Sequence, residues 1–179
     1  SGGVLRSPPS LAANGDLIVL VTEAGNTSLV RKTPQGEETW RTDIAEEDLW
    51  RRAPSIGIDG TIYTICVSSP ESSCEVTGLA AYAPHTGDLK WSVGLQETKF
   101  NYSNVAIGPD GTLYIATNDM FDDVWVLHAV WPDGTLRWSL PTSDRIHHVV
   151  TDSAGNVYAT EQNTGNLLMI SANGTLEWE

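Results

Sequence analysis

Short runs in which apolar residues alternate with polar or small residues, separated by glycine turns, extend along the whole chain. One run is Ile56 to Ile58; the chain then turns at Asp59-Gly60 and continues as Thr61 to Val67. The runs Val124 to Trp131 and Thr135 to Leu140 flank another Asp-Gly pair. Asp-Gly between such runs is a strong hairpin signal, because glycine adopts the positive φ of a tight turn. No segment shows a helical period, so the pattern predicts an all-β chain.

This pattern forms a module that occurs four times. The sequence Asp59-Gly60-Thr61-Ile62-Tyr63 returns as Asp110-Gly111-Thr112-Leu113-Tyr114, with looser copies at Ala154 to Tyr158 and Asn14 to Ile18. A glycine followed four residues later by a tryptophan ends each copy: Gly36 and Trp40, Gly87 and Trp91, Gly134 and Trp138, Gly174 and Trp178. Fixed anchors separated by loops of varying length are typical of a structural repeat.

Each module contains two hairpins, so the four modules predict sixteen strands. Four-stranded antiparallel units that repeat every ~40 to 50 residues are typical of β-propeller blades. A solenoid or a sandwich is the alternative, but successive antiparallel hairpins suit neither. The predicted fold is one all-β propeller domain over residues 1–179, with blades at about 7–42, 52–93, 102–140 and 147–179.

Four blades are the lower limit for a propeller ring. Glu179 follows the fourth tryptophan directly, so no strand remains to close a ring by pairing one end with the other. Three arrangements fit: a closed four-bladed ring, a portion of a ring in a longer chain, or a half ring completed by a second copy. We expect a portion of a larger ring, formed by a longer chain or by two chains, whose open blade edges would favour self-association.

The second module contains the stretch Gly78-Leu79-Ala80-Ala81-Tyr82-Ala83-Pro84-His85-Thr86-Gly87-Asp88-Leu89-Lys90-Trp91. This stretch resembles the repeat of quinoprotein-type (PQQ-like) β-propellers, in which a small residue, a Thr-Gly turn and a terminal tryptophan recur in every blade. Val126-Leu127-His128-Ala129 before Trp138 and Leu168-Met169-Ile170 before Trp178 are similar. The resemblance implies that the four tryptophans pack between blades, and these are Trp40, Trp91, Trp138 and Trp178.

The resemblance also bears on activity. Quinoprotein dehydrogenases of this family have about eight blades, a catalytic aspartate beside calcium, and a quinone that often stacks on a disulfide of adjacent cysteines. This chain has four blades and no matching cofactor cage, and its two cysteines are separated by seven residues. Non-catalytic members serve as secreted or periplasmic binding scaffolds, including subunits that help to assemble outer-membrane proteins. The resemblance therefore implies a non-enzymatic protein without a cofactor.

Cysteine usage and charge restrict the compartment and the partner. Cys66 and Cys74 flank a loop that contains Pro70, which favours a local disulfide and an oxidising compartment, with two buried free thiols as the alternative. Zinc is disfavoured because a second ligand pair is missing. The 23 acidic and 10 basic residues give a net charge of −13, which disfavours nucleic acids and anionic membrane surfaces as partners. No apolar run approaches the ~20 residues of a membrane span.

The loops between second and third strands, and between successive blades, hold the residues suited to binding. The predicted binding residues are Trp50, Arg52, Phe100, Tyr102, Phe121 and Arg145. The alternative for the aromatic members is that they cap the apolar ends of the blades. The acidic loop Asp119 to Asp123 matches no calcium-loop spacing. His147 and His148 are expected to point to opposite faces of a strand, so no metal or catalytic site is predicted.

The sequence as a whole favours a non-enzymatic β-propeller scaffold that binds a protein or a carbohydrate on its loop face. We expect it to be extracellular, at the cell surface or periplasmic, because the disulfide requires an oxidising compartment. Two alternatives remain open: a fragment of a quinoprotein dehydrogenase-like enzyme, and a structural link in a self-assembling fibre or coat.

Overall fold

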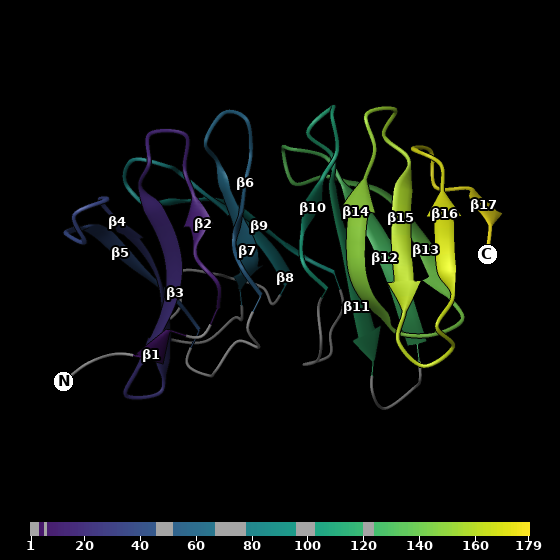
Figure 1. Ribbon diagram of the computed structural model, residues 1–179, viewed down its shortest axis with the longest axis horizontal. Helices are drawn as coiled ribbons and strands as arrows, with labels where there is room; N and C mark the ends of the chain where they lie inside the picture. Colours follow the sequence, from purple (N-terminus) through teal and green to yellow (C-terminus); the bar gives the residue numbers. More distant parts are fainter. Residues whose placement is uncertain (1–3, 6, 46–51, 67–77, 96–102, 120–123) are drawn as a thin grey trace. The chain divides into compact units, whose positions relative to one another are not determined.

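A computed structural model describes residues 4–5, 7–45, 52–66, 78–95, 103–119 and 124–179. These residues form β-strands and connecting turns, and no helix occurs among them. The chain divides into two compact units, Ser1–Gly94 and Leu95–Glu179, each of which contains two antiparallel sheets (Figure 1). We call each sheet a blade. The assignment of residues 1–179 to one domain stays a prediction.

The first unit contains two blades. The first blade consists of β1 (Val4–Leu5), β2 (Ser10–Leu11), β3 (Leu17–Glu23), β4 (Asn26–Lys32) and β5 (Glu38–Ala45). The second consists of β6 (Ser55–Ile56), β7 (Ile62–Cys66), β8 (Gly78–Tyr82) and β9 (Leu89–Gly94). In both blades, neighbouring strands pair in an antiparallel sense.

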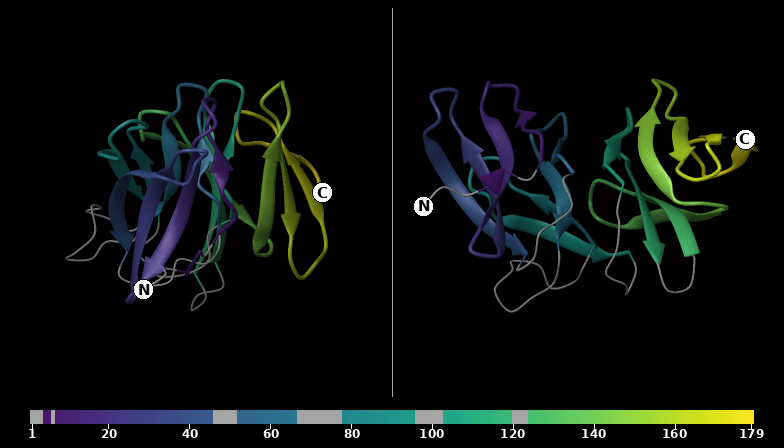
Figure 2. Two further views of the ribbon diagram at one scale, coloured as in Figure 1. Left: turned by 60° about the vertical axis from the view of Figure 1, so that its left-hand side comes forward. Right: turned by 60° about the horizontal axis from the view of Figure 1, so that its bottom comes forward.

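The second unit repeats this arrangement, as Figure 2 shows. Its third blade contains β10 (Ala106–Ile107), β11 (Leu113–Asp119), β12 (Val124–Val130) and β13 (Leu136–Thr142). Its fourth blade contains β14 (Ile146–Thr151), β15 (Val157–Glu161), β16 (Leu167–Ile170) and β17 (Leu176–Trp178). The prediction of an all-β chain with four antiparallel blades is confirmed.

The first blade has one strand more than predicted. Val4–Leu5 pairs with Val21 and Thr22, and Ser10–Leu11 pairs with Leu17 and Ile18, so both short strands lie along β3. Pro8-Pro9 stands between them and has no N–H to donate to a ladder. The prolines therefore divide the innermost strand of this blade into two.

The predicted strand Ile56 to Ile58 is wrong at its C-terminal end, because the observed strand stops earlier. β6 stops at Ile56, because the N–H of Gly57 donates to the carbonyl of Thr61 (2.8 Å) and the N–H of Gly60 donates to the carbonyl of Gly57 (2.9 Å). These two bonds close a tight turn, and Ile58 lies fully exposed at its tip.

Each unit has a hydrophobic core formed by apolar residues of both of its blades. In the first unit the core includes Ile18, Leu20 and Leu29 of the first blade and Ile62 and Tyr82 of the second. In the second unit it includes the residues Tyr114, Leu127, Val149, Val157, Leu168 and Ile170. Strand alternation supplies these inward residues, since every second side chain of a strand faces the same side.

In each of three blades, side chains at equivalent positions form a row across the sheet. Each row has a tyrosine on the second strand and a tryptophan on the fourth. The rows are Tyr63–Ala81–Trp91, Tyr114–Ala129–Trp138 and Tyr158–Met169–Trp178. The tyrosine and tryptophan ring centroids lie 6.0, 5.8 and 6.3 Å apart, within the range of favourable aromatic pairs. In the first blade the same row reads Ile18–Arg31–Trp40.

Two of these tryptophans contact the neighbouring blade of their own unit. The Nε1–H of Trp40 donates to the carbonyl of Pro84 (3.1 Å), and that of Trp138 donates to the carbonyl of Ala172 (3.0 Å). A Cβ on Gly87 would lie 2.6 Å from Cε3 of Trp40, and a Cβ on Gly174 would lie 2.8 Å from Cδ2 of Trp138. The indole rings therefore need glycine in the turn that they cover.

The other two tryptophans contact residues of their own blades through the rows described above. Trp91 packs on Tyr63, and Trp178 lies near Tyr158 with 47% of its side chain exposed. An inter-blade role for Trp91 and Trp178 stays a prediction.

We expect Gly87→Ala to destabilise the protein by about 2 to 4 kcal/mol, because it combines a methyl group against Trp40 with a φ of +74°. Gly36→Ala is the matched control: its φ is +88° and its Cβ would meet nothing within 4 Å, so about 1 kcal/mol is expected. Urea denaturation followed by circular dichroism measures both. Equal losses for the two variants would contradict the packing of Trp40 on this turn.

Candidate functional site

Of the six predicted binding residues, Arg52 and Arg145 lie in the described part of the chain. Trp50, Phe100, Tyr102 and Phe121 lie outside the described residues, as does Cys74. Arg52 is half-buried in the segment before β6, and Arg145 lies between β13 and β14. The site is therefore built here around Arg145, at the end of the second unit that carries the β13–β14 connection and the β15–β16 turn. We call this end the loop end, and the opposite end, with the glycine turns, the turn end.

Asp144 ties the β13–β14 connection to the β15–β16 turn. Its carboxylate accepts hydrogen bonds from the N–H groups of Asn163 (2.6 Å) and Thr164 (3.0 Å) and from Nδ2 of Asn163 (2.8 Å). It also accepts from the N–H of Arg145 (2.7 Å). Burial raises the pKa of Asp144, but the amide donors of Arg145, Thr164 and Asn163 outweigh burial and lower it. Asp144 therefore remains ionised and holds the two segments together.

Glu161 makes a second tie between the same segments. Its Oε1 accepts from Oγ of Ser143 (2.8 Å) and the N–H of Asp144 (3.1 Å). Its Oε2 accepts from Oγ1 of Thr164 (2.7 Å) and Nδ2 of Asn166 (3.3 Å). Both carboxylates are 4% exposed, and a fully satisfied buried polar network makes a loop rigid. Their lone pairs accept hydrogen bonds from both segments.

Arg145 is presented by this rigid loop. Its carbonyl accepts from the N–H of Gln162 (2.8 Å), and its side chain is half-buried. Its guanidinium has no ion-pair or hydrogen-bond partner within the described part of the chain. Other arginines pair with carboxylates: Arg31 with Asp16, Arg41 with Glu38 and Glu23, and Arg137 with Asp110. Arg145 is thus a positioned cation that is available to a ligand.

His147 and His148 do not lie as predicted. Their ring centroids are 4.3 Å apart in an edge-to-face arrangement, so the two side chains do not point to opposite faces. The reason is a β-bulge between Ile146 and His148, which interrupts the alternation of the strand. Bulges re-aim side chains near binding sites, and this one places an imidazole pair two residues beyond Arg145.

A buried histidine at the centre of the third blade was not anticipated from the sequence. Nε2 of His128 lies 3.0 Å from Oγ1 of Thr117, and its Nδ1 lies 2.8 Å from Oγ of Ser139. Burial lowers the pKa of His128 to about 4, so the imidazole is neutral at physiological pH. A general base works best with a pKa near the working pH, and a hydroxyl rather than a carboxylate orients this ring. The arrangement links three strands and is a poor catalytic pair.

The first unit contains a hollow of about 250 Å³ at its turn end. It is lined from the first blade by Asn14, Ile18 and Arg31, and from the second blade by Asp59 and His85. Arg31 and Ile18 are the residues that replace alanine and tyrosine in the row of the second and third blades. This departure from the repeat is visible in the sequence, although only the strand register gives it meaning.

Two features are absent from the described ranges. No group of three or more histidine, cysteine, aspartate and glutamate side chains that could hold a metal ion occurs there. Nor does any helix in those ranges have the length and apolar character needed to cross a membrane.

A comparison with known families gives a clear match. The sequence profile of a PQQ-like propeller family, described as outer membrane protein assembly factor BamB, matches residues 76–179, which is more than half of the chain. The chain belongs to this family. The resemblance inferred from the blade sequences is thereby confirmed. No curated protein matches the sequence significantly.

Solved structures with the same fold are distant in sequence. BamB from Moraxella catarrhalis is 15% identical with a TM-score of 0.59, covering 97% of this chain and 42% of that protein. A gluconolactonase from Xanthomonas campestris is 15% identical with a TM-score of 0.60, covering 94% and 59%. Virginiamycin B lyase from Staphylococcus aureus is 12% identical with a TM-score of 0.65, covering 96% and 54%.

These likenesses show the β-propeller fold, and the chain spans about half the length of the three proteins. The fold is shared by an assembly factor, a lactonase and a lyase, and does not by itself select an activity. Function must be argued from the site.

His128 predicts a specific pH dependence of stability. Its pKa is lowered from 6.5 to about 4 in the folded protein, so between these values the unfolded chain binds more protons. The contribution of neutral His128 to the free energy of unfolding is therefore fully present above pH 6.5. It is lost as the pH decreases to 4, which lowers the free energy of unfolding by about 3 kcal/mol. His128→Gln, which keeps hydrogen-bonding groups but does not titrate, should flatten the curve in this window.

The measurement is a series of urea titrations from pH 7 to pH 4. His85→Gln, the same substitution at an exposed position, is the matched control. An unchanged slope in His128→Gln would show that His128 is not the group responsible.

Proposed function

We propose that this chain is a non-enzymatic β-propeller scaffold of the cell envelope that binds a protein partner at its loop end. The family to which it belongs is described as an outer membrane protein assembly factor, which supports a protein rather than a carbohydrate as the partner. The observation that carries the proposal is Arg145, a cation without a partner among the described residues on a loop that two buried carboxylates make rigid.

This geometry suits protein recognition. Arginine is enriched among the residues that dominate protein interfaces, and a rigid loop lowers the entropy lost on binding. The chain carries a net charge of −13, so a strongly acidic partner would be repelled at long range. We therefore expect Arg145 to engage a single carboxylate or a set of backbone carbonyls on a partner of mixed or basic charge.

The buried ionisable groups of the second unit support a scaffold rather than an enzyme. Asp144 and Glu161 each accept four hydrogen bonds from the surrounding loops. His128 is held neutral between two hydroxyl groups. A catalytic acid or base needs a proton that can be exchanged with a substrate, and these groups are committed to holding strands and loops in place.

Location in an oxidising compartment is the second part of the proposal. Cys66 is buried at the end of β7, and Oη of Tyr82 lies 3.1 Å from its sulfur. We propose that Cys66 pairs with Cys74 and closes the connection between β7 and β8. A closed loop of this size restricts the unfolded chain and stabilises the fold by about 2 to 3 kcal/mol.

Protein purified from the oxidising compartment should therefore show a Cys66–Cys74 linkage in non-reducing peptide mass spectrometry. Dithiothreitol should lower the free energy of unfolding by about 2 to 3 kcal/mol. The double variant Cys66→Ala/Cys74→Ala should be insensitive to the reductant. Two alkylatable thiols in the native protein would contradict both the linkage and the inferred compartment.

The partner is tested by photo-crosslinking in the native cell. A photoreactive residue at Gln162, whose N–H bonds to the carbonyl of Arg145, should form an adduct with one envelope protein, identified by mass spectrometry. The same residue at Asp133, at the turn end of that unit, is the control and should not. Arg145→Ala should reduce the adduct by about tenfold without changing the melting temperature, because an anchoring arginine contributes more than 1 kcal/mol.

An adduct that is unaffected by Arg145→Ala would remove Arg145 from the interface. The non-enzymatic part of the proposal has its own test, which is equilibrium dialysis with pyrroloquinoline quinone and calcium followed by a dye-reduction assay. A stoichiometric, active complex would overturn it.

A further inference from the structure

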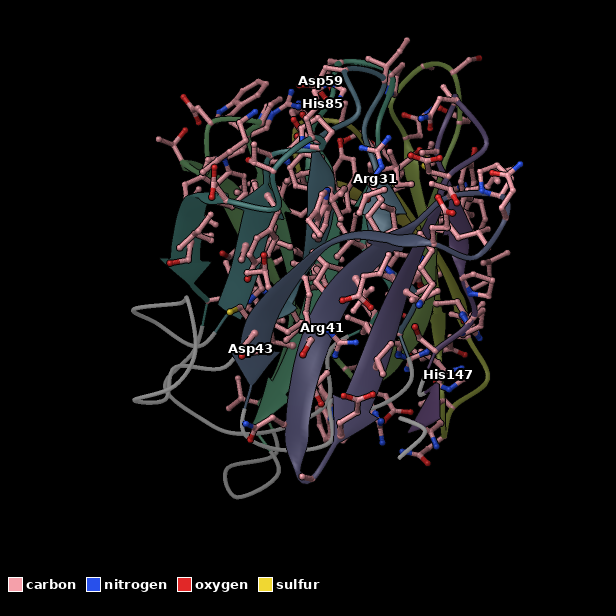
Figure 3. The ribbon with its side chains drawn as sticks, turned by 90° about the vertical axis from the view of Figure 1, so that its left-hand side faces the viewer. Arg31, Arg41, Asp43, Asp59, His85 and His147 are labelled. Atoms are coloured by element: carbon pink, nitrogen blue, oxygen red, sulfur yellow. The ribbon has the colours of Figure 1, made fainter. Side chains whose placement is uncertain are left out.

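The hollow in the first unit lies where that unit departs from the repeat. Its walls are the glycine turns of two blades, 12–14 from the first and 56–60 from the second, together with Pro84 and His85. Figure 3 shows Asp59 and His85 at this end of the unit, with Arg31 beside them and Arg41 and Asp43 farther along the sheet.

The second unit shows what normally fills this position. There Tyr114 is fully buried, and its ring lies over its own turn, where a Cβ on Gly108 would be 3.1 Å from Cε2. Its Oη reaches to 3.5 Å from the carbonyl of Gly155, in the turn of the neighbouring blade. A phenol ring thus bridges the turns of two adjacent blades.

In the first unit the equivalent positions are present but the ring is missing. Ile18 occupies the tyrosine position, because it pairs with Arg31 and Arg31 in turn pairs with Trp40. Ala12, in the turn of the first blade, corresponds to Gly108 in the third blade. Gly60, in the turn of the neighbouring second blade, corresponds to Gly155 in the fourth blade. Ala12, Ile18 and Gly60 all line the hollow. The empty volume therefore occupies the site of the phenol ring of the other blades.

Arg31 gives the hollow a polar wall. Its side chain is 9% exposed, its Nε donates to Oδ2 of Asp16 (2.7 Å), and its Nη1 donates to the carbonyl of Pro84. Hydrogen bonds from Asn14 and from Arg31 lower the pKa of Asp16, so the ion pair is maintained at physiological pH. Nη2 makes no hydrogen bond to the described residues and is not sealed from solvent. It remains as a donor toward a bound oxygen.

The rim of the hollow carries exposed apolar side chains beside the polar Asn14, Asp59 and His85. Ile58, at the tip of the lining turn, is fully exposed, and Leu11, next to the lining Ala12, is 70% exposed. They are the two large apolar side chains of this unit that are exposed among the described residues. A free aromatic molecule in the hollow would leave both in water, whereas a protein surface would cover them.

We propose that this hollow accepts the tyrosine side chain of a protein partner, with the ring between the two turns and the hydroxyl near Nη2 of Arg31 or the carbonyl of Gly60. The inference rests on the proposed function in taking a protein as the partner. A cavity of about 150 Å³ already accommodates benzene, so 250 Å³ is sufficient for a phenol ring. The hollow belongs to the first unit and Arg145 to the second.

The test uses the purified protein and defined probes. Amide chemical shifts of the labelled chain are followed while acetyl-Ala-Tyr-Ala-amide, acetyl-Ala-Leu-Ala-amide or p-cresol is added. The tyrosine peptide and p-cresol should cause saturable shifts at Gly57, Gly60 and Ile62, and the leucine peptide should bind about tenfold more weakly or not at all.

Variants locate the binding. Ile18→Tyr restores the ring of the other blades and should weaken binding by about tenfold or more, because the hollow is filled. Ala12→Gly/Ile18→Tyr serves if the Cβ of Ala12 prevents folding, since glycine occupies that position in the third blade. Ile18→Val is the matched control, which keeps the hollow open and should bind both phenol probes as the parent does.

Three outcomes would overturn the proposal: no saturable shifts, shifts that persist in Ala12→Gly/Ile18→Tyr, or binding of p-cresol without binding of the tyrosine peptide. The last would make the hollow a small-molecule site. None of these results depends on an adduct at Gln162, so failure here and failure of the proposed function at Arg145 are separately recognised.

Discussion

The contact between a tryptophan and the glycine turn of the neighbouring blade underlies the packing within each unit. A four-stranded sheet cannot bury its own apolar face and needs a second sheet against it. Trp40 and Trp138 secure that contact by covering Gly87 and Gly174 and by donating to a backbone carbonyl of the same turn. The indole therefore supplies buried area and a directional bond at once, and the register of the two blades follows from it.

The same scaffold separates structural from functional polar groups. At the loop end of the second unit, buried carboxylates are saturated by loop amides and hydroxyls, and their neighbour Arg145 is left with its guanidinium available. This chain, with 23 acidic and 10 basic residues, pairs Arg31, Arg41 and Arg137 with nearby carboxylates. This cation on a rigid loop, unpaired among the described residues, is the basis of the proposed binding site.

The first blade shows how a repeat can vary without losing its fold. The first blade has Ile18 where the other blades have tyrosine, and Arg31 where the second and third blades have alanine. These differences remove a ring and introduce a buried cation, which Asp16 neutralises. In the second and third blades the cations near the turn come instead from the outermost strand, as Lys90 and Arg137. The tryptophan contact is retained in the first blade, and the space vacated by the ring becomes the hollow.

Period and turn chemistry in the sequence were sufficient to predict the all-β class, the four blades and the family, because Asp-Gly turns and alternating side chains act locally. Local signals could not show that Pro8-Pro9 divides a strand, that a strand ends before Ile58, or that a bulge brings His147 and His148 together. Each of these features depends on pairing with another strand. Arg145 could be chosen from the sequence as a loop cation. That Asp144 and Glu161 hold it, and that Ile18 leaves a hollow, were decided only by tertiary contacts between segments distant in sequence.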